Sequence, residues 1–184
     1  MNYLFLGLKM DANKDCFDKL VSRELTDYVS KENREDFENA LDTKDNWKDP
    51  RDYHVTIFYG GNKSAEEREK HLKDFPEGKR VKTKLKYLVY TVGYNICSYV
   101  RILDPTVKCS NRFSHTTIKT RNSTAVNSND VLECLYAKDK AVFEKPGINT
   151  YYIYTAEDIK KVYVICLDKE ETLINTTATV YKAY

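Results

Sequence analysis

The chain has almost no net charge, although charged residues are abundant. Its 30 lysines and arginines nearly balance its 28 aspartates and glutamates, which leaves a formal net charge of +2 at neutral pH. Proteins that hold long nucleic acids nonspecifically through their phosphates carry a clear positive excess on the binding face. The composition therefore argues against strong nonspecific binding to a phosphate backbone.

Long apolar runs and paired cysteines are also missing. The apolar segment Tyr3–Leu8 is too short for a secretion signal and follows no basic segment, and no stretch approaches the length that spans a bilayer. The five cysteines are widely spaced without a CxxC pair, which favours reduced thiols over disulfides or a zinc site. We therefore expect a cytoplasmic protein without a membrane segment, folded as one domain over residues 1–184.

Histidine is scarce as well, and its distribution is informative. Two of the three histidines, His54 and His115, each begin the tripeptide His-x-Thr, which ends at Thr56 and Thr117. Two such matches among three histidines arise by chance roughly 2% of the time. Both tripeptides lie in β-prone segments, where residues i and i+2 share one face. Each motif therefore presents an imidazole beside a hydroxyl.

Two such pairs facing each other suit the cleavage of a phosphodiester. An imidazole titrates near neutral pH, so one histidine can accept a proton from the attacking group while the other protonates the leaving oxygen. The hydroxyls of Thr56 and Thr117 can donate hydrogen bonds to phosphoryl oxygens as negative charge develops. Such donors can replace a metal ion, so we expect neither a metal nor a cofactor. Which histidine is the acid and which the base is open.

Periodicity and turn residues predict an α+β chain. Strands are predicted at 2–8, 53–59, 80–91, 95–103, 114–120, 150–155, 161–167 and 172–181. Helices are predicted at 14–29, at 32–41, from the capping box Ser64/Glu67 to Phe75, and from an N-cap at Ser128 to Lys138. The segment 42–52 reads as an exposed loop, and 80–103 as a hairpin turning near Gly93. The order motif strand, loop, helix, strands occurs twice, which indicates two structurally similar halves.

On its two motifs the chain resembles the 2H phosphoesterase superfamily, the LigT-like phosphodiesterases. The matching segments are Tyr53–Ile57 and Ser114–Ile118, although Ser114 and Thr116 occupy positions that are often apolar or proline in the family. The resemblance implies a two-lobed, pseudo-twofold α+β fold with antiparallel sheets around a central cleft and helices on the outside. It also implies metal-independent cleavage of nucleotide phosphodiesters. The residues that it assigns to catalysis are His54, Thr56, His115 and Thr117.

Three substrate classes follow from the resemblance. The first is a cyclic di- or oligonucleotide immune messenger of the cGAMP type, which small viral members of the family degrade; the compact chain and its Lys/Asn/Tyr-rich composition suit a virus or another AT-rich genome. The others are 2′–5′ oligoadenylate and a 2′,3′-cyclic phosphate or RNA 3′ end. The near-neutral charge favours a small nucleotide over long RNA. A non-catalytic RNA- or nucleotide-binding module and a structural or interaction domain are the alternatives of another class. No obligate protein partner is indicated.

Residues that flank the motifs are candidate substrate contacts. They are Tyr3, Phe5, Trp47, Tyr59, Arg112 and Lys119, with Arg121 as a further cation. The aromatic rings can stack on bases or pack in the core, and the basic side chains can pair with phosphate or lie solvated at strand ends. Strict alternation puts Tyr59 on the face of Val55 and Ile57, which favours packing. The third histidine, His71, lies among charged residues of a predicted helix and is expected at the surface.

Overall fold

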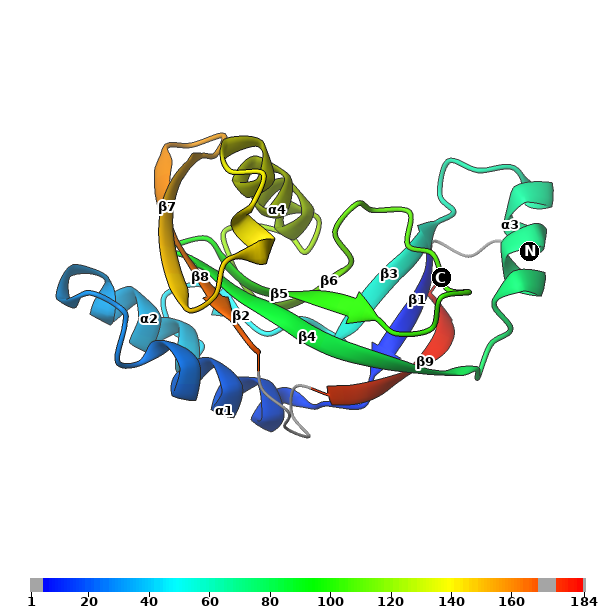
Figure 1. Ribbon diagram of the computed structural model, residues 1–184, viewed down its shortest axis with the longest axis horizontal. Coiled ribbons are helices and arrows are strands. Elements are labelled where there is room, and N and C mark those ends of the chain that lie inside the picture. The colour runs from blue at the N-terminus through cyan, green and yellow to red at the C-terminus, as the bar shows by residue number, and fades with distance from the viewer. Residues whose placement is uncertain (1–4, 169–174, 184) are drawn as a thin grey trace.

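The structure, a computed structural model, describes residues 5–168 and 175–183 (Figure 1). Its helices are α1 (Lys14–Leu25), α2 (Arg34–Leu41), α3 (Ala65–Asp74) and α4 (Asn127–Lys138), with the 3-10 turns η1 (Lys31–Asn33) and η2 (Val142–Glu144). Its strands are β1 (Phe5–Met10), β2 (Trp47–Lys48), β3 (His54–Tyr59), β4 (Arg80–Thr91), β5 (Asn95–Ile102), β6 (His115–Arg121), β7 (Ile148–Tyr154), β8 (Ile159–Cys166) and β9 (Asn175–Ala183). The predicted α+β class is confirmed.

The described strands belong to one antiparallel sheet. Six of them close a ring in the order β3, β1, β9, β4, β5, β6, while β8 and β7 extend from β4 and β2 extends from β6. The sheet is continuous because the long strand β4 pairs with β9 through its first half and with β8 through its second half. The separate sheets that the family resemblance implies are thus joined into one, and the two-lobed arrangement stays a prediction.

Helices cover the two faces of this sheet with two apolar cores. Alternation along β4 shows the division, because Leu88 belongs to the core under α1 and α2 whereas Val89 belongs to the core under α4. In Figure 1, α1 and α2 lie below the sheet, α4 lies above it, and α3 lies at the far end from α4. Within the described residues, no helix is both long and apolar enough to cross a membrane.

Most of the predicted elements form, with shifted ends. The capping box is present, since Ser64 Oγ accepts from the Glu67 amide and the Glu67 carboxylate accepts from the Ser64 amide. The β4–β5 hairpin also forms and turns through Gly93, whose φ is 68°. The predicted N-cap at Ser128 is wrong, because α4 begins at Asn127 and Ser128 lies buried inside it.

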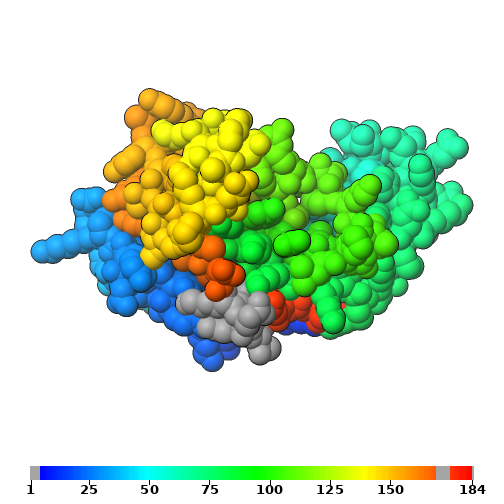
Figure 2. All heavy atoms as spheres, in the orientation of Figure 1, coloured from blue at the N-terminus to red at the C-terminus, as the bar shows by residue number. Residues whose placement is uncertain are grey.

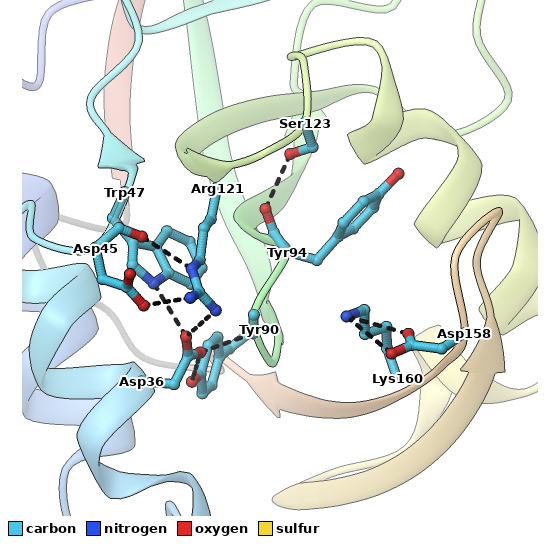
Figure 3. Close-up of polar contacts among 10 residues, drawn as sticks. Asp36, Asp45, Trp47, Tyr90, Tyr94, Arg121, Ser123, Asp158 and Lys160 are labelled. Atoms are coloured by element: carbon cyan, nitrogen blue, oxygen red, sulfur yellow. Dashed lines mark hydrogen bonds and ion pairs between the residues drawn. The ribbon is translucent and has the colours of Figure 1, made fainter.

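The segment 42–52 is not simply an exposed loop, because Trp47 forms part of β2 and is only 2% exposed. Its indole nitrogen donates to the carboxylate of Asp36 on α2, 3.1 Å away. The same carboxylate accepts hydrogen bonds from the Tyr90 hydroxyl, the Gly93 amide and the Arg121 guanidinium (Figure 3). Trp47 and Arg121 therefore join α2, β2, β4 and β6 on the α1/α2 face, and neither is placed to bind a base or phosphate.

Candidate active site

The two His-x-Thr motifs lie on adjacent antiparallel strands. The pairing of β3 with β6 is centred on Val55 opposite Thr116, the middle residues of the motifs. In an antiparallel pair, the residues that flank one bridge lie across from each other and share the opposite face. His54 therefore lies across from Thr117, and Thr56 lies across from His115. The sheet thus brings all four predicted catalytic residues to one face.

Both motif strands carry a bulge one residue after the threonine. On β3 the partners of Gly7 and Leu6 are Thr56 and Phe58, so Ile57 is the extra residue. On β6 the partners of Cys97 and Ile96 are Thr117 and Lys119, so Ile118 is extra. The two isoleucines are at most 1% exposed and belong to the core under α1 and α2. Bulges re-aim side chains next to functional sites, and here both motifs end in the same way.

The imidazole rings are held by the same contact in both motifs. His54 Nδ1 lies 3.2 Å from the Asp52 carbonyl oxygen, and His115 Nδ1 lies 2.9 Å from the Phe113 carbonyl oxygen, in each case two residues earlier. A carbonyl only accepts, so each Nδ1 carries the proton and donates it. In the neutral ring this leaves Nε2 as the basic nitrogen. Neither Nε2 has a hydrogen-bond partner within residues 5–168 and 175–183, so both are available for proton transfer.

The two threonine hydroxyls differ in their surroundings. Thr117 Oγ1 donates to the Ala125 carbonyl at 3.3 Å and lies 2.9 Å from Ser128 Oγ, which in turn receives a hydrogen bond from the Asn95 amide at 3.3 Å. The Thr56 hydroxyl has no partner among the described residues. Thr56 can donate to a substrate without rearrangement, whereas Thr117 must first turn its proton away from Ala125.

Aromatic rings surround His54. Phe5 stacks on it with ring centroids 4.8 Å apart, and Tyr181 of β9 lies edge-on at 6.1 Å. Gly7 makes room for both rings, because a Cβ there would meet Tyr181 Cε1 at 2.9 Å and Phe5 Cε2 at 3.1 Å. The Tyr181 hydroxyl is buried and has no hydrogen-bond partner among the described residues.

Sequence reasoning missed Tyr181 and also Lys9. Lys9 lies directly across from His54 on β1, so the two side chains share a face. Its ammonium is 3.6 Å from Asp52, and its side chain is 59% exposed. On the other side of the site, Tyr99 lies across from His115 and packs edge-on against Phe113 at 5.9 Å. No motif marks these residues, because their neighbours in space come from other strands.

Comparison with known proteins supplies a fold but no family. No protein-family model and no curated protein matches the chain. Solved structures do match, and one of them is similar to the whole chain. It is described as a fungal RNA kinase, with a TM-score of 0.70 and 20% sequence identity. The match covers the whole of this chain and 46% of the other, so the chain spans about half the length of that protein. At this identity the likeness shows a shared fold, and membership of the 2H superfamily stays a prediction.

The structure brings only some of the predicted flanking residues to the site. Tyr3 lies outside the described residues. Tyr59 lies on the face of His54 and not on that of Val55, because the bulge at Ile57 reverses the alternation, and its side chain is 50% exposed. Arg112 is exposed and contacts α4 through Glu133 at 3.4 Å and the ring of Tyr136.

Lys119 and His71 differ from their predicted surroundings. Lys119 is fully buried on the α1/α2 face, because the bulge at Ile118 turns it away from Thr117, and its ammonium pairs with Asp18 and Asp49. It is therefore not placed to pair with phosphate. His71 is only partly exposed, since its ring stacks on Phe58 with centroids 3.8 Å apart.

Burial lowers the pKa of both motif histidines below the ordinary value of 6.5. The bond from each Nδ1 to a backbone carbonyl partly offsets this, and for His115 the charge of nearby His54 lowers the pKa further. Desolvation favours the uncharged ring, so in the free protein both imidazoles are mainly neutral at pH 7. The acid of the pair must nevertheless be protonated.

We therefore expect an acidic optimum for kcat/KM. The rate should fall as the pH rises above the lowered pKa of the acid, and fall again as the base becomes protonated at lower pH. The maximum should lie below the value of 6.5 from which both pKa values are lowered. The check is kcat/KM on a phosphodiester substrate between about pH 4.5 and 8.5. A maximum above about pH 7.5 would contradict the neutral resting state of the rings.

Proposed function

We propose that this protein is a metal-independent phosphodiesterase that cleaves nucleotide phosphodiesters by two-histidine acid–base catalysis. The observation that carries the proposal is the pair of motif histidines on one sheet face, each with Nδ1 bound to the carbonyl two residues earlier and Nε2 free. A structural histidine needs no such repeated arrangement. A reaction that both removes and delivers a proton needs two imidazoles whose free nitrogens face one substrate.

We further propose that the chain has the two related lobes of a 2H phosphoesterase. The equal bulges at Ile57 and Ile118 support this, as do the equivalent pairings of β3 with β1 and of β6 with β5. A pseudo-twofold axis through the Val55–Thr116 bridge would exchange the two motifs. In Figure 2 the surface dips between the atoms of α4 and those of α3, and β3 runs between these helices in Figure 1.

In the proposed reaction, one Nε2 removes the proton from the attacking water or ribose 2′-hydroxyl. The other, protonated, Nε2 donates to the leaving oxygen as the P–O bond breaks. Thr56 donates its free hydroxyl to a phosphoryl oxygen, and Thr117 does so after turning away from Ala125. Because Lys9 shares the face of His54, its ammonium can add positive charge near the phosphate.

Among the substrate classes, a 2′,3′-cyclic phosphate or another RNA 3′ end gains support from the likeness to a protein described as an RNA kinase. 2′–5′ oligoadenylate stays an alternative. A cyclic dinucleotide of the cGAMP type, degraded by a viral protein to evade host defence, is the second candidate. The near-neutral net charge of +2 favours it over long RNA.

A substrate panel in the presence of EDTA tests the proposal. Purified protein is offered 2′,3′-cyclic mononucleotides, 2′–5′ oligoadenylate, a short RNA with a 2′,3′-cyclic end, and 2′,3′- and 3′,3′-cGAMP. We expect turnover of at least one substrate that EDTA does not abolish. Binding without turnover would instead identify a nucleotide-binding module, and neither binding nor turnover would leave a structural or interaction domain.

A further inference from the structure

A polar cavity opens near the end of β6, on the face of the sheet that carries the motif residues. Its volume is about 320 Å³, within the range of small-molecule sites. The residues that line it come from β2, the end of β6, the 122–124 loop and the start of α4: Lys48, Thr120, Asn122, Ser123, Thr124 and Asn127, with Asn46 at the rim. None of these lining side chains is acidic, and Lys48 is the one cation among them.

Part of this lining is fixed by hydrogen bonds within the protein. The Asn127 carbonyl oxygen Oδ1 accepts from the Thr124 amide at 2.8 Å and from the Thr124 hydroxyl at 3.0 Å, so its Nδ2 remains as a donor. Ser123 donates to the Tyr94 carbonyl at 2.9 Å, also drawn in Figure 3. Other lining side chains make no such hydrogen bonds within the described part of the chain. Lys48, Thr120 and the side-chain amide of Asn122 have no partner among the described residues.

The two acids closest to Lys48 in the sequence are both paired with other cations. Asp45 and Asp49, which lie on either side of it in the chain, are each paired with a cation of β6. Asp45 contacts Arg121, and Asp49 contacts Lys119 at 2.7 Å. An anionic group that enters the cavity therefore meets one free ammonium together with amides and hydroxyls.

Strand geometry sets the distance from this cavity to the motif residues. Lys48 lies across from Thr120 on β6, and Thr120 is three residues beyond Thr117. At about 3.3 Å per residue, Thr120 lies on the order of 10 Å from Thr117 along the strand. Asn95, the cross-strand partner of Thr120, bonds to Ser128, which bonds to Thr117. Polar contacts thus link the strand beside the cavity to Thr117.

We propose that this cavity binds a second nucleotide unit of the substrate, one step from the scissile phosphate. Lys48 would pair with a phosphate, and the amides of Asn122 and Asn127 would hydrogen-bond the edge of a base. The proposal rests on the proposed function and narrows it. The substrate class becomes an oligonucleotide or dinucleotide, because a 2′,3′-cyclic mononucleotide cannot reach both the motif histidines and the cavity.

Two substitutions test the cavity without disturbing the fold. Lys48→Met removes the charge and keeps most of the exposed stem. Asn122→Gly removes the amide at a residue whose φ is 48°, a left-handed conformation that glycine adopts freely. Lys31→Met, on the exposed turn η1 beside α2, is the matched control for the lost charge.

Binding of 2′–5′-linked diadenylate and diuridylate, each with a terminal phosphate in addition to the scissile one, is measured by calorimetry in the His115→Ala background, where the proposed chemistry is disabled. We expect Lys48→Met to raise the Kd for at least one dinucleotide about tenfold, Asn122→Gly to raise it severalfold, and Lys31→Met to leave it unchanged. Binding of 2′,3′-cyclic AMP should not respond to any of the three.

The results separate this inference from the proposed function. Dinucleotide affinity that is unchanged in both cavity variants overturns the second subsite, even if the protein proves to be a phosphodiesterase. The subsite is also overturned if the cavity variants weaken the binding of 2′,3′-cyclic AMP by the same factor as that of the dinucleotides. The lost affinity would then not come from contacts with a second nucleotide unit. Affinity that depends on Lys48 without any turnover by the unsubstituted protein supports the subsite and removes the catalytic proposal.

Discussion

Replacement of either motif histidine by alanine is expected to lower kcat for phosphodiester cleavage by at least about a hundredfold. His54→Ala and His115→Ala each remove a free Nε2 from the shared face of β3 and β6. General acid–base catalysis contributes about 10²–10⁴-fold per group, and neither a neighbouring threonine nor water replaces an imidazole near neutral pH. The measurement is kcat and KM on whichever panel substrate the unsubstituted protein turns over.

The third histidine provides the matched control. His71 stacks on Phe58 and carries no His-x-Thr motif, so His71→Ala should keep kcat within about threefold of the parent even if stability falls slightly. The double variant should be little slower than the slower single variant, because residues that act as one unit are strongly non-additive. If either motif variant kept more than about a tenth of the parental kcat, while remaining folded, the acid–base assignment would be wrong.

Local signals explain why the motif strands and the hairpin could be predicted. The His-x-Thr alternation, the Ser64/Glu67 capping box and the turn at Gly93 each depend on residues within four positions of one another. These signals place both imidazoles beside their threonines. They also put the two motifs on equivalent strands, although nothing in the sequence says that β3 and β6 pair directly.

Contacts between distant segments explain what could not be predicted. The bulges at Ile57 and Ile118 reverse the alternation, so Tyr59 lies on the face of His54 and Lys119 leaves the face of Thr117. The prediction that side chains alternate between the two faces assumes a regular strand. One extra residue moves every later side chain to the other face. The charged segment around Trp47 similarly predicts an exposed side chain. In the structure its indole N–H donates a hydrogen bond to Asp36, eleven residues earlier in the chain.

The residues around His54 could not be predicted for the same reason, because they come from strands that are distant in the sequence. Tyr181 reaches it only because Gly7, on the strand between them, has no side chain to exclude the ring. Neither residue carries a motif, and a single sequence gives no measure of which glycine or tyrosine is irreplaceable. The proposed chemistry therefore rests on two tripeptides, whereas the shape of the site depends on strand order.

Lys119 illustrates how a predicted substrate contact becomes a structural one. Its ammonium is fully buried, 2.9 Å from Asp18 on α1 and 2.7 Å from Asp49 in the segment after β2. Lys14 of α1 shares both carboxylates, at 2.5 and 3.3 Å. Burial alone would raise the pKa of Asp49, but Lys119 and then Lys14 outweigh it and hold this pKa below 3.8. The cluster joins α1 to β6 directly behind the site.

We expect Lys119→Ala to lower the free energy of unfolding by about 3 kcal/mol at pH 7, because it leaves two carboxylates facing each other with one cation between them. Lys82→Ala, at an exposed position of β4, should change it by less than about 0.5 kcal/mol. Urea unfolding of the three proteins measures both differences. A Lys119→Ala loss below about 1 kcal/mol would show that the ion cluster contributes little to stability.

The pH dependence of that loss identifies its cause. A carboxylate whose pKa is lowered on folding stabilises the protein above its unfolded pKa, here 3.8, and the contribution disappears as the pH falls through the folded value. The difference between the parent and Lys119→Ala should therefore be full at pH 7 and shrink below about pH 4. Lys119→Met, which restores apolar volume without charge, should recover only the part of the loss that does not vary with pH. A loss that is the same at pH 3.5 and pH 7 would mean that Lys119 stabilises β6 by packing its stem and not by neutralising Asp18 and Asp49.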